Sequence, residues 1–147
     1  MLDTPSEIQL SSQLAAQNKF KVRVYYEDTD AGGIVYYANY LKFFERARTE
    51  WLRKLNINQS FFLEQKLGFV VKKVEMDNLA SAKLDDELVV MSKIIELKRA
   101  SLIFEQKILN NEQVICVAKI RIACVNLQQV KPCIIPESIL GALKSVS

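Results

Sequence analysis

The sequence contains no histidine among its 147 residues. This absence excludes Ser-His-Asp and Cys-His catalysis and every histidine-bound metal site in one step. The cysteines Cys116, Cys124 and Cys133 form no C-x-x-C motif, so no zinc site is expected. An odd and sparse cysteine count favours a reducing cytoplasm over a disulfide framework. Any catalysis must therefore use carboxylates, backbone dipoles, tyrosine or lysine.

Long hydrophobic runs and a strong charge of one sign are also lacking. No segment approaches the roughly 20 apolar residues of a membrane span, so none is expected. The first 19 residues carry acidic side chains and no continuous apolar core, unlike a secretory signal. The net charge of +3 is too small to imply nucleic acid as a partner. We expect a cytoplasmic protein.

The length favours one domain. We assign residues 1–18 to a polar N-terminal extension, with a short helix around Ile8 to Ala16, and residues 19–147 to a single domain. β-Branched and aromatic residues, with partial alternation, predict five strands. They are Phe20–Tyr26, Phe69–Met76, Glu87–Leu97, Leu102–Leu109 and Val114–Val125.

One long helix is predicted from Ala38 or Asn39 to about Lys54, where apolar residues recur at three- and four-residue steps. Its other face is predicted to carry the charged residues Lys42, Glu45, Arg46, Arg48, Glu50, Arg53 and Lys54. Residues 56–66 read as a short helix or irregular chain, and residues 137–146 as a closing helix. Two prolines, Pro132 and Pro136, are expected to end the sheet. The order of elements predicts an α+β fold with one helix on one antiparallel sheet.

The most informative segment is Tyr25–Tyr40, in which a strand runs into an acidic turn, two glycines and a helix. Asp30 is thereby placed before a helix N-terminus, in a loop that Gly32 and Gly33 allow to be tight. The helix start offers free N–H groups to a developing oxyanion, and the carboxylate offers a base or nucleophile. These are the two parts that an acyl-transfer site needs.

The acidic residues of this segment also suit purely structural roles. Aspartate commonly caps helices and stabilises turns, so Asp30 has a structural explanation as well as a catalytic one. Asp28 is expected to stabilise the turn. A calcium loop is excluded because its fifth and twelfth positions are Gly32 and Asn39, where the twelfth requires a bidentate glutamate.

The motif Y-x-D-T-D-A-G-G-I-V-Y-Y-A-N-Y-L-x-x-F-E-R-A-R-T-E, together with the order of elements, resembles the hotdog-fold acyl-CoA thioesterases. More narrowly, it is similar to the 4-hydroxybenzoyl-CoA thioesterase family, in the branch associated with the bacterial Tol–Pal system. The resemblance covers about residues 19–136. It implies an antiparallel sheet wrapped around one long central helix, and two protomers that join their sheets. A homodimer or homotetramer is implied, with active sites at the subunit interface.

Residue by residue, the resemblance places Asp30 on the family's catalytic carboxylate. Gly33, Ile34 and the residues up to Tyr37 fall on the segment that receives the thioester carbonyl, with the Tyr37 backbone N–H polarising it. Many members of the branch have histidine at the position of Tyr37. The run Glu96–Ser101 matches the basic turn that meets the phosphates of coenzyme A. Its contributors here are Lys98, Arg99 and Ser101, and Ala100 replaces a third basic residue found in some relatives.

The expected function is hydrolysis of short-chain or aromatic acyl-CoA thioesters, with Asp30 as general base or nucleophile. No cofactor and no metal is expected, because coenzyme A is part of the substrate. An acyl carrier protein is a second candidate carrier of the acyl group. A non-catalytic module that binds acyl-CoA or acyl carrier protein is the alternative. A hotdog hydratase or dehydratase is disfavoured because the usual enzymes of that kind use a histidine, which this chain lacks.

Overall fold

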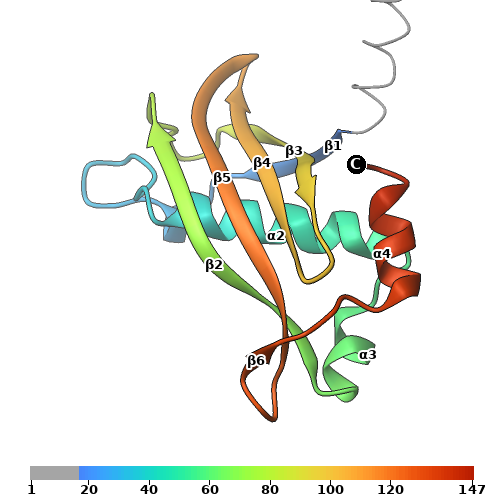
Figure 1. Cartoon of the computed structure of the whole chain (residues 1–147). Helices are drawn as coiled ribbons and strands as arrows, with labels where there is room; N and C mark the ends of the chain where they lie inside the picture. Colours follow the sequence, from blue (N-terminus) through green and yellow to red (C-terminus); the bar gives the residue numbers. More distant parts are fainter. Residues whose placement is uncertain (1–16) are drawn as a thin grey trace, which may run out of the picture.

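The computed structural model describes residues 17–147, and the expected helix around Ile8 to Ala16 lies outside them. An antiparallel sheet curls around the long helix α2 (Asn39–Lys54), as Figure 1 shows. The strands are β1 (Asn18–Arg23), β2 (Leu67–Asn78), β3 (Glu87–Leu97), β4 (Ser101–Asn110), β5 (Gln113–Asn126) and β6 (Lys131–Pro132). Two short helices, α3 (Gln59–Glu64) and α4 (Glu137–Lys144), complete the chain. The α+β expectation is confirmed.

The strand order in the sheet is β1-β3-β4-β5-β2, and every neighbouring pair is antiparallel. The short strand β6 pairs with Val125 and Asn126 at the end of β5. These two residues lie beyond Ala123, where the pairing of β5 with β4 stops. This leaves β1 and β2 as the outer strands of the main order. The 12 residues of β2 therefore present one unpaired edge, which a protein must protect from uncontrolled pairing.

The core lies between the inner face of the sheet and one face of α2. Tyr40, Phe43, Phe44, Ala47 and Trp51 recur at helical spacing and are buried. Full burial of one such large apolar side chain is worth about 1.5–3 kcal/mol. The position of α2 is therefore set by packing, since Ala38 at its N-cap makes no side-chain capping bond.

Two expectations about the elements are wrong. The first strand ends at Arg23 and not at Tyr26, because Tyr26–Asp28 form a 3-10 turn closed by the Tyr25 N–H on the Asp28 carboxylate at 2.8 Å. The sheet ends at Pro132, the last residue of β6, as the sequence predicts. A two-residue strand at the sheet margin tolerates proline because only one ladder partner is required there.

The second error concerns the charged face of α2. Arg48 is only 8% exposed and points into the protein. Glu50 forms an i,i+3 ion pair with Arg53 at 2.7 Å. In the part of the chain that the structure describes, no helix is long and apolar enough to span a membrane.

Candidate active site

The Asp30 loop is closed by its own backbone. The Asp30 N–H donates to the Ile34 carbonyl at 2.9 Å, and the Gly33 N–H donates to the Asp30 carbonyl at 3.0 Å. Gly33 has φ of +79°, a conformation that favours glycine. A Cβ added at Gly32 would lie 3.2 Å from Asp30 Oδ1. The two glycines therefore give the turn its shape and leave room for the carboxylate.

The Asp30 carboxylate is exposed and held by its own turn. Its Oδ1 accepts the Gly32 N–H at 2.8 Å. Among residues 17–147, Oδ2 of Asp30 has no hydrogen-bond partner. The turn-bracing role thus occupies one carboxylate oxygen and leaves the other available to an incoming molecule.

Asp28 joins this loop to the start of α2. Its buried backbone carbonyl accepts the Tyr36 N–H at 3.0 Å and the Asn39 side-chain amide at 2.8 Å. Asp28 thus has the structural role expected for it.

The start of α2 carries two unused donors. In the described part of the chain, neither the Tyr37 nor the Ala38 N–H reaches a hydrogen-bond acceptor, whereas the Asn39 and Tyr40 N–H groups already donate to carbonyls. The first turn of a helix characteristically leaves such donors free, and they carry part of its positive pole. The Tyr37 side chain is 56% exposed, so the helix start is open to solvent in the single chain.

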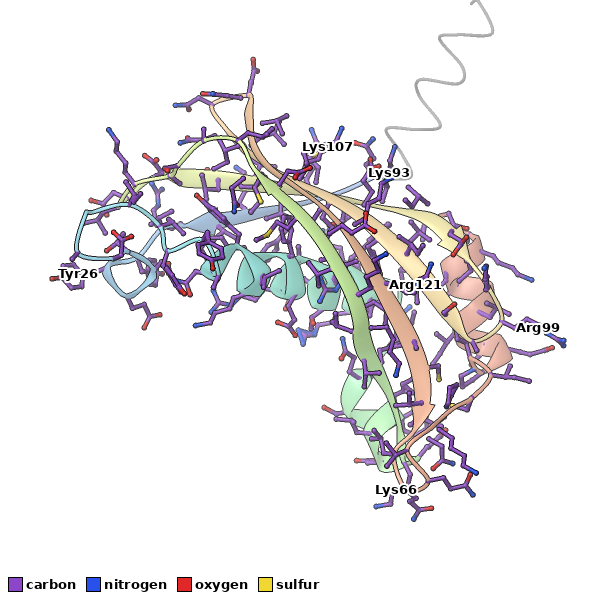
Figure 2. The ribbon with its side chains drawn as sticks, turned by 60° about the vertical axis from the view of Figure 1, so that its left-hand side comes forward. Tyr26, Lys66, Lys93, Arg99, Lys107 and Arg121 are labelled. Carbon is purple, nitrogen blue, oxygen red and sulfur yellow. The ribbon has the colours of Figure 1, made fainter. Side chains whose placement is uncertain are left out.

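The predicted phosphate-binding turn is a tight connection between β3 and β4. The Lys98 N–H donates to the Ser101 carbonyl at 2.8 Å, and the Arg99 carbonyl accepts the Ile135 N–H at 2.8 Å. Both basic side chains are exposed, and Lys98 lies 3.8 Å from Glu96. Figure 2 shows Arg99 projecting away from the sheet. The turn thus presents two cations on a fixed backbone.

A single chain does not bring this turn to Asp30. Strand β3 begins beside the loop, since the neighbouring Lys83 forms a bridge with Ile34. It then runs for 11 residues, roughly 35 Å at 3.3 Å per residue, before Lys98. The loop and the turn accordingly lie toward opposite ends of the molecule, on either side of Figure 2, where Tyr26 and Arg99 mark them.

A buried polar network, which the sequence reasoning missed, lies between α2 and the sheet. Arg48 Nη1 donates to Gln106 Oε1 at 3.0 Å. Gln106 Nε2 donates to the Phe44 carbonyl at 3.0 Å and to Ser92 Oγ at 2.9 Å. Burial lowers the pKa of Arg48 to about 10, an effect that the nearby Glu45 carboxylate partly offsets. The signal for this network in the sequence is Gln106, a polar residue at one of the inward-facing positions of β4.

Comparisons with known proteins agree with this architecture. Residues 24–143 match the profile of the thioesterase-like superfamily. The chain belongs to this superfamily. It is 51% identical over 124 residues to the acyl-CoA thioesterase YbgC of Haemophilus influenzae, covering 84% of this chain and 91% of that protein. The family expectation from the Asp30 motif is confirmed.

Solved structures of superfamily members have the same fold. A probable thioesterase from Bartonella henselae is 38% identical, with a TM-score of 0.79 over 82% of this chain and 99% of that one. The gentisyl-coenzyme A thioesterase BH1999 is 30% identical, with a TM-score of 0.79 over 85% of this chain and 98% of that one. The hotdog fold and the assignment of the chain as a thioesterase are thereby confirmed.

Proposed function

We propose that the protein hydrolyses acyl-CoA thioesters at the Asp30 loop. The observation that carries the proposal is the arrangement of a carboxylate with one free oxygen, fixed by Gly32, beside a helix start with the unused N–H groups of Tyr37 and Ala38. The acyl-CoA thioesterase YbgC of H. influenzae supports coenzyme A as the carrier. The acyl group we expect is short-chain or aromatic, and the gentisyl-coenzyme A thioesterase supports the aromatic class.

In the proposed reaction the thioester carbonyl oxygen accepts the Tyr37 N–H, which stabilises the negative charge that develops on that oxygen. Ile34 and Gly33 border the acyl group. Asp30 either removes a proton from the attacking water or attacks the carbonyl carbon itself to form a mixed anhydride that water then opens. In both routes the C–S bond breaks and coenzyme A leaves as its thiol. One oxyanion donor is worth about 3–4 kcal/mol and a general base roughly 10²–10⁴-fold.

Two protomers are needed in this proposal, because one chain separates Asp30 from Lys98, Arg99 and Ser101. The unpaired edge of β2 supports a second copy as its partner. The Asn78 end of β2 lies near the Asp30 loop. The Leu67 end lies near the turn between β3 and β4, where the Cys124 N–H donates to the Ala100 carbonyl. Pairing two β2 strands antiparallel about a two-fold axis therefore brings the loop of one protomer toward the turn of the other.

The proposal extends to the remaining partners. A homodimer formed in this way can pair again to a homotetramer. The exposed cations Lys98 and Arg99 suit the phosphates of coenzyme A, or the phosphopantetheine arm of an acyl carrier protein, equally well in charge. The three free cysteines favour a cytoplasmic location. The chemistry proposed here needs no cofactor and no metal.

The test is thiol release from a panel of acyl-CoAs by wild type, Asp30→Asn and the control Glu27→Gln. Glu27 is an exposed acid of the same loop. We expect kcat to fall by about 10²-fold or more in Asp30→Asn and to stay near wild type in Glu27→Gln, with unchanged thermal melts. A wild-type protein that binds acyl-CoA without releasing thiol would instead be a binding module. Single-turnover hydrolysis in isotopically labelled water tests the nucleophilic route, since label enters the Asp30 carboxylate only when water opens a mixed anhydride at the Asp30 carbonyl carbon.

A further inference from the structure

A cavity of about 110 Å³ lies between the second half of α2 and the inner face of the sheet. Its walls are mainly apolar and include Leu52, Phe104, Ile122 and Leu143. Arg48 also lines this cavity, as the buried cation among these side chains. The cavity is distinct from the Asp30 loop, because Arg48 lies about 16 Å beyond Tyr37 along the helix axis at 1.5 Å per residue.

Arg48 lacks a counter-charge in the part of the chain that the structure describes. None of the salt bridges among residues 17–147 includes it, and its bonded partner is the neutral Gln106. A pKa of about 10 keeps the guanidinium protonated at neutral pH. A buried charge without an opposite charge is costly, so a ligand that supplied an anion would be favoured here. The guanidinium has five donors in a planar fork, and only Nη1 is used.

Three other polar side chains, those of Glu45, Thr49 and Gln59, line the cavity and limit what can bind. Glu45 is exposed, and its Oε1 accepts the Thr49 hydroxyl at 3.1 Å. Its negative charge lies at the solvent side of α2, so an anion in the cavity is best placed deeper, against Arg48. A cavity of about 150 Å³ holds benzene in a well-studied case, so this one suits a body of about four to six carbons.

From these observations we propose that the cavity binds a small carboxylate, RCOO⁻. The carboxylate pairs with the guanidinium of Arg48, and the R group, a single ring or short branched chain, packs against Leu52, Phe104 and Ile122. The free acid that thioester hydrolysis releases has this chemistry, and so does any other small carboxylic acid that is free in solution. The binding itself does not require that the protein be a hydrolase.

Isothermal titration with benzoate and with the neutral benzamide, which has the same shape, tests the proposal. Wild type should bind benzoate roughly tenfold or more tightly than benzamide, because a charge-assisted pair is added. Arg48→Met keeps the length of the side chain and removes the charge, so it should abolish this preference. Arg53→Met is the matched control, since Arg53 is exposed on the same helix and does not line the cavity. It should bind both compounds as wild type does.

Equal binding of the two compounds to wild type, or a benzoate preference that survives in Arg48→Met, would overturn the proposal. If Arg48→Met fails to fold, wild-type protein alone still decides the matter. Benzoate ring protons should then show intermolecular NOEs to the methyl groups of Leu52, Ile122 and Leu143. NOEs confined to other parts of the molecule contradict the site.

Kinetics shows separately whether the released acid is the ligand, and the calorimetric test does not depend on that outcome. If the ligand is the released acid, benzoate inhibits thiol release in wild type and not in Arg48→Met. If the ligand is a different small carboxylic acid, benzoate leaves thiol release unchanged although calorimetry still shows the benzoate preference. A wild-type protein that binds benzoate and shows no thioesterase activity would refute the proposed function and leave the carboxylate site intact.

Discussion

The side-chain amide of Asn39 donates a buried 2.8 Å hydrogen bond to the Asp28 carbonyl, eleven residues earlier in the chain. Asn39 is the first residue of α2, and Asp28 is two residues before the proposed catalytic carboxylate. One hydrogen bond therefore links the two parts of the candidate site, the acidic loop and the helix start. The Tyr36 N–H reinforces it on the same carbonyl.

Replacing Asn39 by alanine should loosen this link. We expect a loss of about 1–2 kcal/mol in the free energy of unfolding, because a buried hydrogen bond is removed. The kcat of thiol release should fall as well, since Asp30 is then held less firmly relative to the helix start. Denaturant unfolding and steady-state kinetics measure the two effects. Lys42→Ala, an exposed change on the same helix, should alter neither.

Tyr37→Phe should keep most of the activity. The mechanism uses the backbone N–H of Tyr37, which any residue except proline retains, and gives the side-chain hydroxyl no step. The ring is 56% exposed and should influence which acyl groups are accepted. Comparing kcat/KM for benzoyl-CoA and a short-chain acyl-CoA checks both points. A Tyr37→Phe enzyme as inactive as Asp30→Asn would give the hydroxyl the catalytic role.

The double variant Lys98→Ala/Arg99→Ala should raise KM more than it lowers kcat. These cations are remote from the reacting carbon and contact the substrate alike in the ground and transition states. The effect should shrink as salt is added, because charges exposed to solvent are screened beyond about 10 Å at 0.1 M. Kinetics at low and high ionic strength provide the measurement. An unchanged KM at low salt would remove the turn from the site.

The edge of β2 should hold the dimer together. Val71 and Val74 are half-exposed on this strand although they are β-branched and apolar. Val71→Glu/Val74→Glu should yield monomers in light scattering and reduce activity, because the proposed site needs two protomers. Val130→Glu is the matched control, since this exposed valine lies outside β2. A monomeric wild-type protein with full activity would exclude the interface site.

Cys124 and Cys133 should form a disulfide under mild oxidation. Their sulfur atoms are 3.3 Å apart, and the Cys133 N–H donates to the Cys124 carbonyl at 2.9 Å. Diamide removes two hydrogen atoms from the pair and is itself reduced, which intact-mass spectrometry detects. Burial raises the pKa of the Cys124 thiol to about 12, so oxidation should accelerate as the pH rises and thiolate forms. Cys133→Ser should prevent the reaction, whereas Cys116→Ala should not.

Most of the fold could be predicted from the sequence because its signals are local. The apolar spacing of α2 and the alternation along β3, β4 and β5 each depend on side chains a few residues apart. The predicted range Glu87–Leu97 agrees with β3 at both ends. The first strand was predicted too long because Tyr25 and Tyr26 have high β-propensity, while the Asp28 carboxylate turns the chain there through a hydrogen bond.

The sequence alone was enough to identify the family and the Asp30 motif, since that information resides in one continuous segment, Tyr25–Tyr40. Only the tertiary structure decided what distant segments do together. Arg48 reads as one more charge on the outer face of α2, yet packing turns it inward to Gln106, 58 residues away. Lys98 and Arg99 lie one strand length from Asp30, a separation that follows from the direction of β3. Burial and distance depend on how elements pack, which no local pattern of residues encodes.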